Sequence, residues 1–312
     1  EKLTLNTGLH YTIFAANGKQ SLEPRAGLKW QFAPNQSLNA GFGVHSRLHD
    51  MTIYFAQRFI DDRFQLINKN LDLTKSYHYV IGYDRMIGED LHLKVETYYQ
   101  QLTNVPIAPA FYTDPEKQVI SGLNVNDGFT TDSLVSNGTG RNYGLEITLE
   151  KFFTNNYYFL FTSSLFESKY KGSDGIERNT RFNNRYIFNI LGGKEFKVGK
   201  DKNNLIGVNL KGVWVGGNRY VPADVDASFA QGEAVYQWDR AFDVKVADYF
   251  RVDMRLSYRK NKKKHATIIS LDIQNVTNRE NIYTQFFDED DMHVETVTQL
   301  GLLPVLNYRL EF

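Results

Sequence analysis

Short and long spacers alternate along this chain between segments in which every second side chain is apolar. In YFRVDMRLSYR (249–259), the residues from Phe250 to Tyr258 alternate between apolar and polar. Successive side chains of a β-strand point to opposite faces, so each such segment predicts a strand with one apolar and one polar face. We find about twelve such segments and no convincing amphipathic helix.

The spacers differ in length according to a simple rule. The short ones are 33–36, 88–90, 154–156, 197–202 and 260–264, and the long ones are 48–73, 105–140, 169–182, 217–247 and 279–298. Soluble domains rarely carry several structureless loops longer than about 12–15 residues. Outer-membrane barrels combine short periplasmic turns with long extracellular loops. The chain is therefore predicted to be all-β, a transmembrane antiparallel β-barrel whose last strand ends at the short-turn rim.

Composition agrees with a membrane barrel. Aromatic residues make up 14% of the chain although the mean hydropathy is −0.44, and the 36 basic residues balance the 36 acidic ones. A secreted β-sandwich is the alternative, but it would bury its aromatic residues and does not need the spacer asymmetry. No apolar run is long enough for a membrane-spanning helix. The chain has no cysteine, so disulfide content does not indicate its redox compartment.

The order of the segments adds a resemblance. LEPRAGLKWQF, SYHYVIGYDRMIGEDLHLKVETYYQQLTNVPI, GTGRNYGLEITLEKFF, FTSSLFESKY, FRVDMRLSYRKN, LDIQNVTNRENIY and the closing LPVLNYRLEF occur in this order. Together they resemble the C-terminal barrel half of a TonB-dependent outer-membrane receptor of the Bacteroidetes type, over essentially all of residues 1–312.

The resemblance implies the last twelve strands of a roughly 22-stranded barrel in the bacterial outer membrane. We expect the N-terminal plug domain, the TonB-contacting box and the early strands to be absent from this chain, because the alternation that begins at Leu3 makes Glu1 look like a cut inside a strand. The implied function is energised uptake of a scarce nutrient, such as a siderophore, glycan or peptide.

The implied partners are the receptor's own plug, periplasmic TonB acting through that plug, the barrel-assembly machinery, outer-membrane lipid and lipopolysaccharide, and in some relatives a surface lipoprotein. Two alternatives remain: a passive twelve-strand porin-like channel, and a receptor-like structural subunit of an outer-membrane complex. No nucleophile elbow, phosphate loop or zinc-protease motif indicates an enzyme. The basic run KNKKKH (260–265) falls in a predicted tight turn, where it would meet inner-leaflet phosphate groups rather than nucleic acid.

Strand parity identifies candidate residues on the lumen face. They are Lys94, Glu96, Glu146, Glu150, Arg251, Asp253, Arg255, Asp272 and Gln274. In the full receptor these side chains would contact the plug or line the path beside it, or would form a purely structural polar network.

The long loops 105–140 and 217–247 are expected to meet the ligand. The second carries four aromatic residues, Tyr220, Phe229, Tyr236 and Trp238, which offer a stacking surface for a sugar, peptide or chelate, or simply pack the loop. At the C-terminus, Tyr308 and Phe312 are implied by the resemblance to be the signal read by the assembly machinery, or are lipid-facing girdle residues.

Two sets of residues are considered for a metal ion, and no cofactor is expected. His45 and His49 spread by roughly 13 Å along a strand, so they need partners from another strand. Asp288, Asp290 and Asp291 offer oxygen ligands for a structural Ca²⁺ but lack the spacing of an EF-hand. The stretch NGTGRN (137–142) is predicted to be a turn that uses Gly138 and Gly140.

Overall fold

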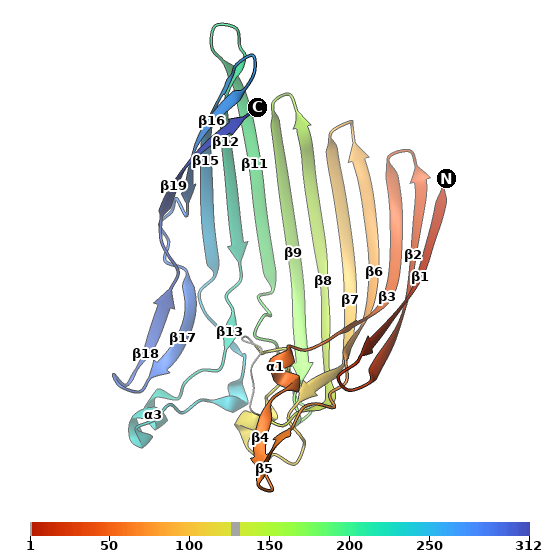
Figure 1. The fold of residues 1–312 in the computed structure, drawn as a ribbon, viewed down its shortest axis with the longest axis vertical. Helices are drawn as coiled ribbons and strands as arrows, with labels where there is room; N and C mark the ends of the chain where they lie inside the picture. The colour runs from red at the N-terminus through yellow and green to blue at the C-terminus, as the bar shows by residue number, and fades with distance from the viewer. Residues whose placement is uncertain (1, 126–131) are drawn as a thin grey trace.

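The computed structural model describes residues 2–125 and 132–312. Within them, twelve long strands form one antiparallel sheet in the order in which they occur in the sequence (Figure 1). The strands are β1 (Leu3–Phe14), β2 (Lys19–Ala33), β3 (Gln36–Arg47), β6 (Thr74–Ile87), β7 (Leu91–Ile107), β8 (Val135–Thr154), β9 (Tyr157–Lys171), β11 (Tyr186–Val198), β12 (Asn204–Val215), β15 (Tyr249–Asn261), β16 (Ala266–Gln274) and β19 (Leu303–Glu311). Short β10 (Glu177–Asn179) pairs with the end of β9.

The two faces of the sheet differ in chemistry. Paired residues on neighbouring antiparallel strands share a face. One row across the sheet runs through Lys94, Thr148, Thr162, Asn189, Val213 and Arg251. The adjacent row, on the other face, runs through Tyr83, Val95, Ile147, Ser163, Phe188, Trp214 and Phe250. We call these the polar face and the apolar face.

The apolar face is exposed along most of its length. Large side chains such as Leu5, Ile81, Ile190 and Leu306 are more than half exposed. A soluble protein rarely exposes a continuous apolar surface of this extent, whereas the outer wall of a membrane barrel does. The predicted fold class, a membrane β-barrel wall, is confirmed.

The two ends of the sheet also differ. The short turns at 34–35, 88–90, 155–156, 199–203 and 262–265 lie at one end, together with the C-terminus, and the long connections lie at the other (Figure 1). We call these the short-turn end and the long-loop end. The predicted alternation of short and long connections is correct after β2, and the β1–β2 turn at 15–18, within the modest first connection AANGKQS that the sequence set apart, is short although it lies at the long-loop end.

The long connections contain regular elements that the sequence pattern did not indicate. They contain the helices α1 (Met51–Tyr54), α2 (Pro115–Gln118) and α3 (Val225–Gln231), the 3₁₀ turn η1 (Trp238–Arg240), and the small hairpins β4 (Gln57–Ile60) with β5 (Arg63–Leu66), β13 (Arg219–Tyr220) with β14 (Val244–Lys245), and β17 (Ile282–Asp288) with β18 (His293–Thr298). Most of these elements are too short for a period-two or helical pattern to reveal them, and the 7-residue β17 (IYTQFFD) does not alternate. No helix in the described part of the chain is long and apolar enough to cross a membrane.

The predicted turn at residues 137–142 is also wrong, because these residues belong to β8. A Cβ added at Gly138 would lie 2.4 Å from Cγ2 of Ile107 and 2.7 Å from the carbonyl oxygen of Val105. The glycine therefore allows close approach of β7 to β8 rather than a turn.

The sheet is open at both edges within the described residues. β1 pairs only with β2, and β19 pairs only with β16. This sheet therefore does not close into a twelve-strand barrel, which the passive-channel alternative requires.

Candidate functional site

All nine predicted lumen residues lie on the polar face. The register joins Glu96 to Glu146 and Arg255 to Asp272 directly, and the remaining residues occupy the same parity of their strands. The structure divides them into two groups, one on β7 and β8 and the other on β15 and β16.

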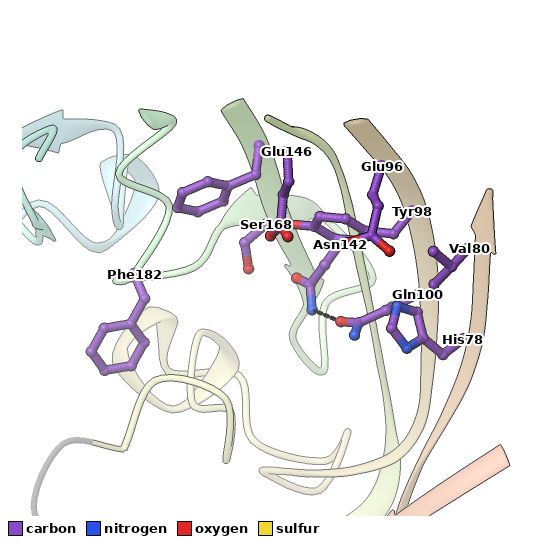
Figure 2. Close-up of a pocket in the computed structure, with 10 residues that line it drawn as sticks. His78, Val80, Glu96, Tyr98, Gln100, Asn142, Glu146, Ser168 and Phe182 are labelled. Carbon is purple, nitrogen blue, oxygen red and sulfur yellow. Dashed lines mark hydrogen bonds between the residues drawn. The ribbon is translucent and has the colours of Figure 1, made fainter. Parts of the chain in front are cut away.

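Two members of the first group, Glu96 and Glu146, line a cavity of about 510 Å³ at the long-loop half of the polar face. Lys94 forms an ion pair with Glu96 at 2.6 Å, and Glu96 and Glu146 face each other across β7 and β8. Figure 2 shows these carboxylates beside Tyr98, with Asn142 Nδ2 donating a hydrogen bond to Gln100 Oε1 at 3.0 Å. This cavity therefore presents carboxylates, an amide pair and a phenol, which suit a polar occupant.

Glu150 lies on the same face nearer the short-turn end, opposite His92. His92 itself contacts Asp84, with its Nε2 2.9 Å from the carboxylate Oδ1. The structure therefore does not bring Glu150 into the cavity with Glu96 and Glu146.

The second group forms a network of paired charges. Arg251 contacts Asp253 at 2.6 Å and donates to Gln274 Oε1 at 3.0 Å, while Arg255 lies 3.4 Å from Asp272. Asp253 also accepts the backbone N–H of Asn275 at 2.8 Å. Because each charge has a partner, this part of the polar face resembles a structural network more than an open binding surface.

The sequence-based prediction missed the most enclosed carboxylate of the polar face. Glu23 is 2% exposed and contacts His10 and Arg25 at 3.1 Å each, and it accepts hydrogen bonds from Thr12 and Ser46. The signal available in the sequence was that His10 and Glu23 stand opposite each other in the β1–β2 hairpin.

The long connections pack against one another around a small apolar core. Val119, Tyr170, Ala241 and Phe242 are buried together, and they come from three different connections and strand ends. The Tyr170 hydroxyl donates to the carbonyl oxygen of Val119 at 3.0 Å. The connections β7–β8 and β12–β15 are thus fixed to the end of β9.

Arg219 reinforces this assembly from within. It is buried and donates to the carbonyl oxygens of Asn183 at 3.0 Å, Phe242 at 3.2 Å and Asp243 at 2.9 Å. A guanidinium can serve several acceptors at once because its five N–H groups form a rigid fork. Burial lowers the pKa of Arg219 from its usual value.

A second apolar core anchors the β3–β6 connection. Phe14, Ile53, Tyr54, Leu71 and Leu134 are buried together there. Buried Asn68 also donates to the carbonyl oxygen of Asp132 at 2.9 Å and accepts the N–H of Leu134 at 2.8 Å. The buried apolar side chains of this protein thus gather mainly at the long-loop end rather than inside the sheet.

Asp248 fixes the start of β15 to its neighbours. Its carboxylate accepts hydrogen bonds from the Tyr186 hydroxyl, from Trp214 Nε1 at 3.3 Å and from the N–H of Gly217 at 3.2 Å, and it pairs with Lys245 at 3.1 Å. Burial acts to raise the pKa of Asp248, but the donors outweigh it and lower the pKa to about 2.

The four predicted ligand-binding aromatics do not form one surface. Tyr236 and Trp238 are neighbours, with ring centroids 5.8 Å apart, and Trp238 packs on the core around Tyr170. The Phe229 ring instead lies near that of Phe287 in the β17–β18 hairpin, with centroids 6.5 Å apart. Tyr220 lines a separate cavity. The structure therefore supports a packing role for Trp238.

An aromatic residue that the sequence-based prediction did not include has a more central position. Phe182, in the β10–β11 connection, lines the 510 Å³ cavity and two further cavities of about 440 Å³ and 370 Å³ at the long-loop end. It is 43% exposed, and Figure 2 shows it apart from the strand residues, across the cavity from them. No local pattern distinguishes it, because its position depends on the packing of three connections.

The residues considered as metal ligands make the following contacts. Asp288 accepts the N–H groups of Asp290 at 2.9 Å and Asp291 at 3.2 Å, which shapes the β17–β18 turn. His45 neighbours His78, with ring centroids 6.4 Å apart, whereas His49 lies by Tyr54. In residues 2–125 and 132–312, no group of three His, Asp or Glu side chains is arranged to hold a metal ion. A structural Ca²⁺ stays an untested prediction.

The predicted assembly residues lie at the free edge of the sheet. Tyr308 points to the apolar face and is well exposed, and Phe312 is 97% exposed, with its ring centroid 6.4 Å from that of His265. Neither residue is needed to pack a core.

Comparison with known proteins identifies the family. The family model described as TonB dependent receptor-like, beta-barrel, matches residues 1–276. The chain therefore belongs to the TonB-dependent receptor β-barrel family, whose members are outer-membrane proteins that use TonB and a plug domain. A comparison with curated protein sequences finds no match.

Solved structures agree on the fold. The outer membrane transporter YddB from Escherichia coli has a TM-score of 0.68 and 13% identity, over 99% of this chain and 43% of its own. The ferric yersiniabactin uptake receptor FyuA from Yersinia pestis has a TM-score of 0.66 and 12% identity, over 100% of this chain and 43% of its own. BauA, the ferric preacinetobactin receptor from Acinetobacter baumannii, has a TM-score of 0.63 and 12% identity, over 100% of this chain and 40% of its own. The chain thus spans about two fifths of these proteins.

Proposed function

We propose that this chain is the C-terminal part of the barrel of a TonB-dependent receptor that takes up a scarce nutrient across the outer membrane. The polar face would surround the plug of the full-length receptor, and the long-loop end would face the outside and meet the ligand first. The family assignment and the chemistry of the two faces support this proposal. A Bacteroidetes origin, a surface lipoprotein partner and contacts with the assembly machinery stay predictions.

One observation carries the assignment of the ligand route. Phe182 borders two cavities of the long-loop end and also the cavity on the polar face that contains Glu96 and Glu146. A ligand that passes from the loops to the polar face would therefore contact this ring. The names of the solved relatives make ferric chelates the first ligands to test.

Uptake of labelled ferric chelates by cells that produce the full-length receptor tests the proposal. We expect uptake to stop when a protonophore collapses the proton gradient, whereas a passive channel would keep admitting ligand. Phe182→Ala should lower ligand affinity about tenfold, as expected for the loss of one stacking aromatic worth about 1.4 kcal/mol. Phe64→Ala is the matched control, because Phe64 is exposed in the β4–β5 hairpin, outside the two loops expected to meet the ligand, and lines none of these three cavities.

The two readouts separate two kinds of failure. Uptake that survives the protonophore would refute active transport. Energised uptake with equal affinity in the two variants would keep the receptor assignment and refute the route past Phe182.

A further inference from the structure

Two short turns at the short-turn end are joined into one surface. β12 pairs with β15, so the β11–β12 turn at 199–203 lies beside the β15–β16 turn at 262–265. Asn261 connects the two turns through two hydrogen bonds. Its backbone N–H donates to Asn204 Oδ1 at 3.1 Å, and its Nδ2 donates to the carbonyl oxygen of Asn203 at 2.6 Å.

This joined surface is strongly basic. Residues 197–202 and 260–265 contain seven lysines and one acidic residue, Asp201, a net of six positive charges. The seven lysines are exposed: Lys260 lies on the apolar face, Lys197 on the polar face, and Lys200, Lys202, Lys262, Lys263 and Lys264 in the two turns. We call them the lysine patch. Among the described residues, no carboxylate forms an ion pair with any of the seven.

The other short turns do not share this charge. The turn at 34–35 is Pro-Asn, the turn at 155–156 is Asn-Asn, and the turn at 88–90 is Gly-Glu-Asp. Asp90 of the last turn is held by Lys151 at 2.7 Å, which leaves Glu89 exposed there. The positive charge therefore marks one sector of the rim and is not a general property of it.

An apolar row lies directly next to the patch on the membrane side. The register links Phe196, Ile206, Tyr258, Ile269 and Tyr308 across five neighbouring strands. All five side chains are well exposed on the apolar face, and Lys194 Nζ lies 5.4 Å from the centre of the Phe196 ring. Tyr258 is only two residues from Lys260, roughly 7 Å along the strand.

This arrangement matches a membrane interface that carries negative charge. Aromatic and aliphatic side chains enter the edge of the hydrocarbon region, and lysines a few ångströms further out reach the phosphate groups. Each lysine close to an anionic lipid surface strengthens binding by about fivefold.

We propose that the lysine patch is a binding site for anionic phospholipids of the inner leaflet, which would gather at this sector of the barrel. The proposal does not depend on the ligand or on the route past Phe182. It extends the prediction for residues 260–265 alone, because the β11–β12 turn supplies almost half of the lysines.

Native mass spectrometry of the full-length receptor tests the site, with phosphatidylglycerol as the probe and phosphatidylcholine, which is zwitterionic and has no net charge, as the reference. Two variants each remove two lysines of the patch: K200Q/K202Q and K263Q/K264Q. The matched control K69Q/K171Q removes two exposed lysines of the long-loop end. The charge-preserving variant K263R/K264R separates loss of charge from damage to the turn.

We expect each patch variant to lose roughly tenfold or more of its preference for phosphatidylglycerol. The control and the arginine variant should keep that preference. Equal retention of phosphatidylglycerol by the patch variants and the control would overturn the proposal. Chemical crosslinking of the same variants in cells tests for a protein partner. If the patch variants keep their lipid but lose a crosslinked acidic periplasmic protein, the proposal is overturned and the patch binds a protein instead.

Discussion

Tyr170→Phe tests whether the long connections are held as one packed assembly. Tyr170 is 1% exposed, and its hydroxyl donates to the carbonyl oxygen of Val119 at 3.0 Å. Phenylalanine keeps the ring against Phe242 but leaves that buried carbonyl without this donor. Leaving a buried acceptor unsatisfied costs about 1–3 kcal/mol. A cost of about 1.4 kcal/mol corresponds to a tenfold larger population of locally opened connections.

Limited proteolysis of the full-length receptor in outer-membrane vesicles measures this population. Cleavage follows the equilibrium population of the open form when opening and closing are faster than cleavage. We therefore expect cleavage within residues 108–125 and 216–248 to become about tenfold faster in Tyr170→Phe, while the strands stay protected. Tyr283→Phe is the control, because Tyr283 is exposed and sits in the β17–β18 hairpin.

Equal cleavage rates in the two variants would refute the argument that the Tyr170–Val119 bond fixes the connections. Faster cleavage at β17–β18 alone would refute it as well, because that hairpin does not contribute to the core around Tyr170.

Three further predictions concern single residues. Arg219→Met leaves three carbonyl acceptors unpaired and should destabilise the long-loop assembly by about 3 kcal/mol, seen as faster cleavage of residues 216–248. The pKa of Asp248 is lowered to about 2, so its stabilisation is present at neutral pH and is lost as the pH falls from about 4 to 2. Asp248→Asn should remove this acid step from the pH profile of pepsin cleavage, whereas an unchanged profile would contradict the assignment. Phe312→Ala removes a side chain that packs on almost nothing, so the stability of the folded barrel should change by less than about 0.5 kcal/mol. If Phe312 is an assembly signal, the amount of folded receptor in the outer membrane should still fall; an unchanged amount would support the girdle role.

The wall of the barrel was predictable from the sequence because the alternation that indicates each strand lies within that strand. The alternation in 249–259 depends only on neighbouring residues, and so does the length of a turn such as 155–156. Strand parity then assigned Lys94 and Arg251 to one face without any knowledge of the register.

The site was less predictable because its residues meet through contacts between distant segments. Glu23 needs partners from three strands, and Phe182 gains its position from three packed connections. The aromatics of 217–247 were grouped because they are close in sequence, yet Phe229 and Trp238 pack in different places. Sequence proximity is a poor guide inside a connection that folds back on itself.

The neighbouring residues Asn189 and Ile190 of β11 show how the two faces should respond to the same change. Asn189 lies on the polar face and Ile190 on the exposed apolar face. A lysine on the lipid face near the middle of the membrane costs about 2–4 kcal/mol, whereas a lumen position tolerates charge. Ile190→Lys should therefore lower the free energy of unfolding of the full-length receptor in lipid vesicles by that amount, measured by urea titration. Asn189→Lys should change it by less than about 0.5 kcal/mol. Equal effects would mean that the exposed apolar face does not contact lipid. The assignment of inside and outside, on which the cavity and the lysine patch both depend, would then have to be reversed or abandoned.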